Sequence, residues 1–163
     1  MIFRLSQKLN SKIKVGTLPP LPLNENPIAD WSAHLFVADR KQYLLLSNTS
    51  SLYSTVVCCN GITNESKFVE CAVDGIREFM EDDAQEFVYR RFISPHSGAI
   101  SFAKALNRSV IGSMTDMIHL ATAWLIEGEL SPHEIGFRLN ETPFSSLKYI
   151  NPRETFKNLA SEP

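Results

Sequence analysis

The segment 31–47 decides the fold, and it reads WSAHLFVADRKQYLLLS. Two runs of strand-forming residues, 31–38 and 42–47, flank the polar residues 39–41. Apolar runs of this length on either side of a short polar turn are typical of a β-hairpin. Because both runs are almost continuously apolar, we expect other elements to cover both faces of the hairpin.

Strand signals recur on both sides of the hairpin. Segments rich in aromatic and β-branched residues predict further strands, at 1–5, 51–58, 86–93 and 99–106. We therefore expect an α/β protein of the α+β type, with a mostly antiparallel sheet of about five strands and two main helices packed on it. The chain has 163 residues, which is the size of one domain, so residues 1–163 are expected to form a single domain.

The two main helices are predicted over 64–80 and 109–127, where apolar residues recur with the helical period and give each helix one apolar face. Asn64 is a good N-cap for the first helix, and Ser109 or Ser113 for the second. Shorter helices are expected in three further places: after Ser6, over 132–139 and over 152–159. The proline-rich connector 17–30 is expected to be a loop that lies against the core.

Composition limits the class of protein. The formal net charge of −2 argues against a protein that coats nucleic acid through bulk charge. The three cysteines, Cys58, Cys59 and Cys71, show no paired spacing, which favours a reducing compartment, and we expect a cytoplasmic protein. No segment approaches about eighteen consecutive apolar residues, and the N-terminus does not have the pattern of a signal peptide, so we expect no membrane span.

A local basic face for nucleic acid is an alternative that the sequence leaves open. Tyr89 would supply a stacking residue, and the cations would be Arg4, Lys8, Lys12, Lys14, Arg90 and Arg91. The sequence contains no helix-turn-helix, RNA-recognition or zinc-finger signature. Ordinary surface charge is the simpler interpretation of these residues.

Several segments together resemble a family of short bacterial proteins built on a domain of unknown function. The segments are Ile2–Leu9, Asp30–Lys41, Leu44–Asn48, Asn107–Met114 with Asp116, and Leu139–Pro143. The resemblance runs over nearly the whole chain and implies a compact bacterial protein with a single domain. It implies no activity, substrate or catalytic residue.

The best candidate for a binding site lies at the start of the predicted helix 109–127. The first turn of a helix presents free N–H groups and a partial positive charge, and Arg108 could add a cationic fork for a phosphate or carboxylate. The predicted site consists of Arg108, Ser109, Ser113 and Asp116, with Asn140 and Thr142 as neighbours from the tail. The simpler alternative is that the serines cap the helix, Arg108 pairs with an acid, and Asp116 is favoured by the helix dipole.

The leading hypothesis is a non-enzymatic accessory protein that binds a partner or a small anionic ligand. The sequence contains no phosphate loop and no Gly-x-Ser-x-Gly elbow. Its four histidines have no metal-ligand spacing, so we expect neither a metal nor a cofactor. A small enzyme acting on a phosphorylated or nucleotide substrate is one alternative, with Arg108 stabilising charge and Asp116 or His119 as base. A nucleic-acid-associated regulator is another, and a homodimer is one expected assembly.

Overall fold

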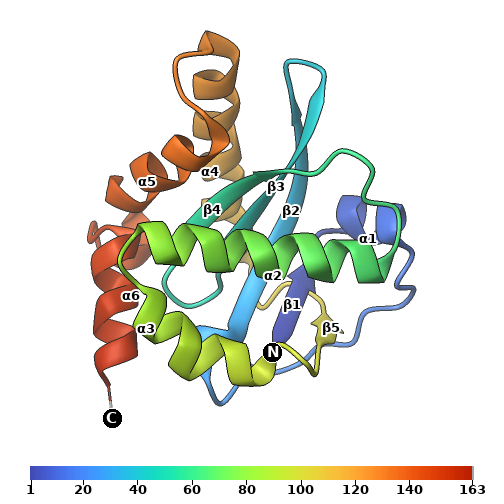
Figure 1. Ribbon diagram of the computed structural model, residues 1–163, viewed down its shortest axis with the longest axis vertical. Helices are drawn as coiled ribbons and strands as arrows, with labels where there is room; N and C mark the ends of the chain where they lie inside the picture. Colours follow the sequence, from blue (N-terminus) through green and yellow to red (C-terminus); the bar gives the residue numbers. More distant parts are fainter. Residues whose placement is uncertain (163) are drawn as a thin grey trace.

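A computed structural model describes residues 1–162, and its centre is one mixed five-stranded sheet (Figure 1). The sheet has the order β4-β3-β2-β1-β5. Its strands are β1 (Ile2–Leu5), β2 (Asp30–Ala38), β3 (Lys41–Asn48), β4 (Ser54–Cys58) and β5 (Ser101–Ala103). Strand β3 is antiparallel to β2 and β4, whereas β1 is parallel to both β2 and β5. The α+β class is confirmed, and the expectation of a mostly antiparallel sheet is wrong.

The predicted hairpin is present as β2 and β3, with Ala38 opposite Lys41. The two turn residues, Asp39 and Arg40, both have positive φ, 46° and 64°. Two consecutive positive φ angles give the turn that matches the right-handed twist of the flanking strands. The local signal in the sequence was therefore sufficient to place this part of the sheet.

The parallel pairing follows from the connection between β1 and β2. The chain leaves β1 through the short helix α1 (Gln7–Ile13), and then returns along the proline-rich connector to begin β2 beside β1. A crossover that carries the chain back to the start of the sheet makes the next strand parallel. Ser6 caps α1, since its hydroxyl oxygen accepts a hydrogen bond from the N–H of Leu9 at 3.3 Å.

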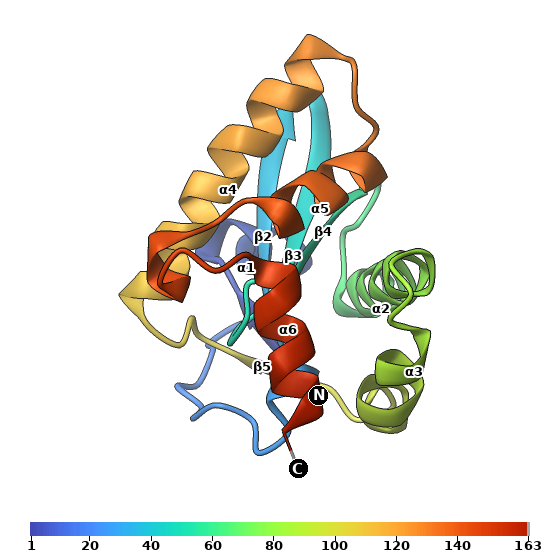
Figure 2. The same cartoon turned by 90° about the vertical axis from the view of Figure 1, so that its left-hand side faces the viewer.

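Residues 1–162 contain six α-helices rather than two main ones. They are α1 (Gln7–Ile13), α2 (Glu65–Asp82), α3 (Glu86–Val88), α4 (Arg108–Glu127), α5 (Pro132–Glu141) and α6 (Pro152–Ser161). The two long helices predicted from the sequence are α2 and α4, and they lie on opposite faces of the sheet (Figure 2). Asn64 caps α2 as predicted, and Gly128 ends α4 as a left-handed C-cap with φ 75°.

The sheet separates two apolar cores. On one face, Phe3, Trp31 and Leu44 pack with residues of α1 and α2. On the other face, Phe36 and Leu45 pack with residues of α4 and α5. Each strand of the hairpin therefore contributes alternate residues to the two cores, which is why its sequence is apolar on both sides.

The segment 86–93 is helical, so the prediction of a strand there is wrong. It forms α3 and a continuing π-helical turn (Tyr89–Ile93). Tyr89 and Ile93 are buried, whereas Phe87 is 70% exposed. Buried residues four apart are the helical period, and this period outweighs the high strand propensity of the aromatic residues.

Helix α4 is the one helix of residues 1–162 that is long and apolar enough, by length and composition, to cross a membrane. Core helices of globular proteins meet the same criterion. In this structure Met114, Met117 and Ala121 are buried against the sheet, so its apolar character has a role in packing. The absence of a membrane span remains a prediction.

Candidate functional site

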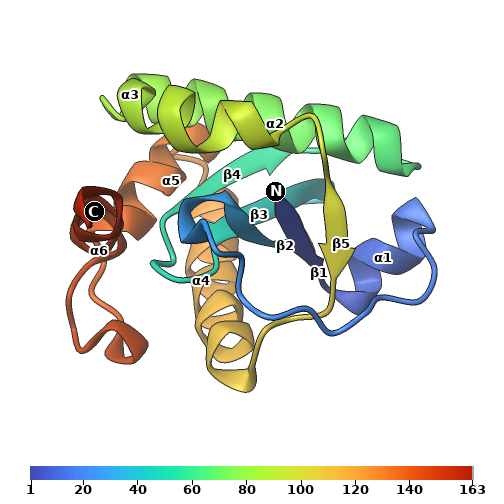
Figure 3. The same cartoon turned by 90° about the horizontal axis from the view of Figure 1, so that it is seen from below.

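Strands β1 and β5 are neighbours, run parallel and end at the same edge of the sheet (Figure 3). After β1 the chain enters α1, whose Leu9 and Ile13 belong to the core beneath α2. After β5 it enters α4, whose Val110 and Met114 belong to the opposite core. Where two adjacent parallel strands continue to opposite faces, a crevice opens between the two connections, and open α/β sheets bind ligands there.

A pocket of about 530 Å³ lies at this position. Leu5 and Ala105 come from the segments at the ends of β1 and β5, Leu18 comes from the connector, and Ile111 comes from α4. These four residues make the apolar part of the wall. The volume falls in the range of small-molecule sites, which are concave and mostly apolar with a few polar groups.

The polar groups of the pocket begin with Ser6 and His34. The backbone N–H of Ser6 donates to the carbonyl of Ala33 at 3.1 Å, and Leu5 is paired with Ala33. Ser6 therefore lies beside His34 on the neighbouring strand. Neighbouring strands are about 4.8 Å apart, so these two polar residues form one patch.

The imidazole of His34 makes no hydrogen bond to any part of residues 1–162 that the structure describes. Burial lowers the pKa of His34 below its ordinary value of 6.5, because desolvation disfavours the charged ring. The ring is therefore neutral at pH 7, and it offers one donor and one acceptor nitrogen. A neutral, unpaired imidazole in a pocket is available to a ligand.

The pKa of His34 predicts how stability depends on pH. The unfolded chain binds this proton more readily than the folded chain, so the free energy of unfolding falls as the pH drops below the ordinary value of 6.5. Urea unfolding of wild type and His34→Gln at about pH 7.5 and about pH 5.5 measures this effect. We expect wild type to lose more stability than the variant. An equal loss in both proteins would show that His34 is not the group responsible, since the other three histidines are shared.

Asn10 contributes an unpaired acceptor. Its Nδ2 donates to the carbonyl of Gly16 at 2.7 Å, while its buried Oδ1 has no partner among the described residues. A buried acceptor without a partner costs about 1–3 kcal/mol. Turning the amide over would place Oδ1 against the Gly16 carbonyl, so the orientation is fixed. Asn10 lines the pocket, but its Oδ1 is enclosed by protein atoms and presents no surface to a bound molecule.

Lys104 is the charged side chain that lines this pocket, with no carboxylate beside it there. It follows β5 directly, and its backbone N–H donates to the carbonyl of Pro19 at 3.0 Å. The connector and the segment after β5 are therefore hydrogen-bonded to each other beside the pocket. The side chain of Lys104 is exposed at the rim, where it can meet an anion.

A buried ion pair between Arg4 and Asp30 fixes these two walls. The Nε and one Nη of Arg4 both donate to the carboxylate at 2.8 Å, and the side chains are 1% and 0% exposed. The remaining donors reach the carbonyls of Leu21, Pro22 and Lys104 at 2.9, 2.9 and 3.2 Å. All five N–H groups of the guanidinium are thus used, and they bond the connector to the segment after β5.

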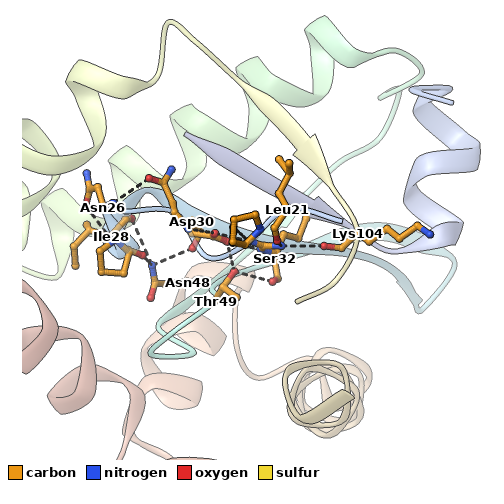
Figure 4. Close-up of polar contacts among 12 residues, drawn as sticks. Leu21, Asn26, Ile28, Asp30, Ser32, Asn48, Thr49 and Lys104 are labelled. Atoms are coloured by element: carbon orange, nitrogen blue, oxygen red, sulfur yellow. Dashed lines mark hydrogen bonds and ion pairs between the residues drawn. The ribbon is translucent and has the colours of Figure 1, made fainter. Parts of the chain in front are cut away.

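The carboxylate of Asp30 is equally well satisfied (Figure 4). It also accepts a hydrogen bond from the hydroxyl of Thr49 at 2.7 Å and from the N–H of Asn24 at 3.0 Å. The hydroxyl of Thr49 is in turn 2.9 Å from that of Ser32. A buried ion pair is stable only with such additional hydrogen bonds, so this network is structural and holds the connector against the segment after β5.

Two residues of the predicted basic face are buried and cannot contact nucleic acid. Arg4 is buried in the ion pair, and Tyr89, the predicted stacking residue, is buried in the core. Arg90 forms an ion pair with Glu86, one helical turn away, at 2.5 Å. A basic face that includes Arg4 and Tyr89 is therefore wrong for this structure.

The start of α4 differs from its prediction. Asn107, and neither Ser109 nor Ser113, caps the helix, because its side chain accepts from the N–H of Val110 at 3.0 Å. Both serines line a smaller hollow of about 260 Å³. The hydroxyl of Ser113 is 2.7 Å from that of Ser146, so it is already paired.

The other four predicted residues lie elsewhere. Arg108 and Asp116 are exposed on α4 and do not line that hollow. Asn140 is buried and bonds to the backbone of Ser54, while the hydroxyl of Thr142 donates to the carbonyl of Arg138 at 2.8 Å. Of the six predicted residues, the structure brings only Ser109 and Ser113 together in this hollow.

Asn10, His34 and Lys104 were not predicted from the sequence to belong to one site. Each follows or belongs to a strand that ends at one edge of the sheet, a position that favours ligand binding in parallel sheets. To predict the site from these positions, one must know that β1 lies between β2 and β5 and is parallel to both. Neither fact follows from the sequence pattern.

A mixed α/β sheet with a ligand-sized pocket at the carboxyl ends of its parallel strands defines the class of this protein. The chain belongs to the family that shares a domain of unknown function, DUF6933, whose model matches residues 2–155. The match confirms the family resemblance and assigns no activity. No curated protein and no solved structure matches the chain.

Proposed function

We propose that the protein binds a small anionic molecule with an apolar body, in the pocket at the ends of β1 and β5. The observation that carries the proposal is a pocket of about 530 Å³, with Lys104 as its charged lining residue. It lies in the crevice where the chain continues from β1 and from β5 to opposite faces of the sheet. Sites at such crevices are recurrent in open α/β sheets. The proposal keeps the small anionic ligand that was expected from the sequence. It places the binding site at the ends of β1 and β5 instead of at the start of α4.

Charge supports an anion as the ligand. Lys104 has no carboxylate beside it in the pocket lining, and the nearby guanidinium of Arg4 is neutralised by Asp30. A cation at the rim of an apolar hollow favours a carboxylate or phosphate at that end of the ligand.

The walls support an apolar body. Leu5, Leu18 and Ile111 surround the space beyond Lys104, and burial of apolar ligand surface supplies most of the affinity in such sites. The hollow at the start of α4 is about half as large, at about 260 Å³, and has no charged lining residue. It therefore fits an anionic ligand less well.

Titration followed by protein NMR tests the proposal, with indole-3-propionate as an anionic probe and indole-3-propionamide as its neutral counterpart. We expect the acid to bind about tenfold more tightly than the amide, since a charge-assisted hydrogen bond contributes about 1.5–3 kcal/mol and a tenfold change is about 1.4 kcal/mol. Lys104→Met should remove most of that difference. The shifted amide signals should include those of Ser6 and Ile111.

The matched control is Lys67→Met, because Lys67 is exposed on α2 and lies outside this pocket. This variant should bind both probes as wild type does. Equal binding of acid and amide to wild type, or shifts confined to another surface, would refute an anion site in this pocket.

A further inference from the structure

A second hollow, the α3–α6 hollow, lies between α3 with its continuing π-helical turn and the last turns of α6 (Figure 1). Its volume is about 460 Å³, and it shares no lining residue with the pocket at the ends of β1 and β5. π-Helical turns are rare and often occur at functional sites. A buried amide and two cations in this hollow indicate what it binds.

Gln85 supplies the buried amide. The residue is 7% exposed and lines the α3–α6 hollow. Its side chain forms no hydrogen bond within the described part of the chain, and neither Oε1 nor Nε2 is fully enclosed by protein atoms. The amide, with its two donor hydrogens and its acceptor oxygen, is therefore open to a ligand in the hollow.

The two cations come from the two walls of the hollow, Arg91 from the π-helical turn and Lys157 from α6. The Cζ of Arg91 lies 5.9 Å from the ring centre of Phe87 and 5.2 Å from that of Phe92. Such contacts hold a guanidinium in place and leave its N–H groups available. Neither cation forms an ion pair within residues 1–162, although Glu162 lines the same hollow. A ligand carboxylate would match the fork of Arg91.

The α3–α6 hollow adjoins another of about 530 Å³, which shares Phe92 and Glu162 with it. The two hollows together form an elongated groove beside the end of α6, and this shape suits an extended chain. The charged residues of the adjoining hollow are Glu25 and Glu162. An acidic group is therefore favoured only at the end of the groove that contains Arg91 and Lys157.

We infer that the α3–α6 hollow binds an extended acidic peptide segment of a partner protein, with an Asp or Glu side chain at Arg91 and Lys157 and a neighbouring peptide group at the amide of Gln85. Arginine recognises acidic motifs in other peptide-binding proteins, and a side-chain amide can both donate to and accept from a peptide group. Phe87 is 70% exposed, so its ring offers apolar surface to a side chain next to the acidic residue. This function is independent of the pocket at the ends of β1 and β5.

Selection from a phage library of random seven-residue peptides, with the wild-type protein as the target, tests the ligand class. We expect the selected sequences to share an Asp or Glu at one position. A synthetic peptide of such a sequence should bind about tenfold more tightly than its Asn or Gln counterpart in an NMR titration, because the counterpart lacks the charge-assisted hydrogen bond. The shifted amide signals should include those of Val88 and Ala160, which line the hollow.

Arg91→Met should remove most of this tenfold preference for the acidic peptide. Arg90→Met is the matched control, because Arg90 lies next to Arg91 in the same turn, forms an ion pair with Glu86 and does not line the hollow. It removes the same charge and should leave the preference intact.

Gln85→Leu should weaken binding of the acidic peptide and of its neutral counterpart equally, by about tenfold, because both lose the partner of the same peptide group. Its thermal midpoint should stay at or above that of wild type, since a buried amide without a partner does not stabilise the fold. A destabilised variant with unchanged binding would show that the amide is structural. If Gln85→Leu does not fold, the two arginine variants still decide the charge requirement.

Four results would overturn the inference. They are a library that yields no binder, binders without a shared acidic position, a preference that survives Arg91→Met, and shifts confined to another surface. Concentration-dependent shifts of the Val88 and Ala160 signals in the protein alone would identify a second copy of the chain as the occupant, and would also overturn it.

Discussion

Asp30→Ala is expected to lower the free energy of unfolding by about 3–5 kcal/mol, the loss typical when one partner of a buried ion pair is removed. The variant leaves the guanidinium of Arg4 buried without its counter-charge. It also removes the acceptor for Thr49 and Asn24. Urea unfolding followed by circular dichroism measures the change from the midpoint and slope.

The double variant Arg4→Met/Asp30→Leu should lose less stability than the sum of the two single losses, since no uncompensated charge remains. It should not return to wild-type stability, because the carbonyls of Leu21, Pro22 and Lys104 lose their donor. As a surface control, Arg77→Ala breaks an exposed ion pair with Asp74, and exposed pairs contribute about 0–1 kcal/mol. A loss below about 1 kcal/mol for Asp30→Ala would show that the ion pair is not a structural support.

Arg4 also connects stability to binding. It donates to the carbonyls of Leu21 and Pro22 in the connector and to the carbonyl of Lys104, which lines the pocket. A ligand site holds its geometry only when its supporting residues are themselves held. The structure therefore gives Arg4 the role of a positioning residue for the pocket, and no direct contact with the ligand.

The local elements of this fold could be predicted from the sequence. The hairpin β2–β3 has a polar two-residue turn between apolar runs, and α2 and α4 have the helical period over about five turns each. Ser6 and Asn64 each precede a helix and cap it. These signals act between residues that are close in the chain, so one sequence contains all of the necessary information.

The long-range features could not be predicted. The parallel direction of β1 depends on where the proline-rich connector leads, and the guanidinium of Arg4 holds that path through the carbonyls of Leu21 and Pro22. In the sequence Arg4 stands in a basic segment and suggests surface charge. Its burial requires Asp30 and three carbonyls that come from distant positions, one of them 100 residues away.

The candidate site was misplaced for the same reason. The start of α4 has local anion-binding features, and these are visible in the sequence. The pocket at β1 and β5 consists of Asn10, His34 and Lys104, which come from three separate segments. The unpaired acceptor of Asn10 depends on its bond to Gly16, a geometric fact that no residue pattern expresses.

Asn140→Ala is expected to lower the free energy of unfolding by about 2–6 kcal/mol, because it leaves two buried backbone groups without partners at about 1–3 kcal/mol each. The Oδ1 of Asn140 accepts from the N–H of Ser54 at 2.7 Å, and its Nδ2 donates to the carbonyl of Ser54 at 2.9 Å. Strand β4 is an edge of the sheet, so this amide replaces the neighbouring strand that an edge lacks. Thermal or urea unfolding measures the loss.

Two further variants decide whether this role is structural or part of a binding site. Asn140→Asp keeps an acceptor for the N–H of Ser54 but places a second oxygen against its carbonyl, so a large part of the stability should still be lost. Thr142→Val should change stability by less than about 0.5 kcal/mol, because the Thr142 hydroxyl bonds only within its own helical turn. An Asn140→Ala protein that unfolds like wild type but no longer binds indole-3-propionate would contradict a structural role and favour the site predicted from the sequence. A destabilised variant whose folded fraction binds the probe normally would place Asn140 in the architecture of β4, outside the ligand site.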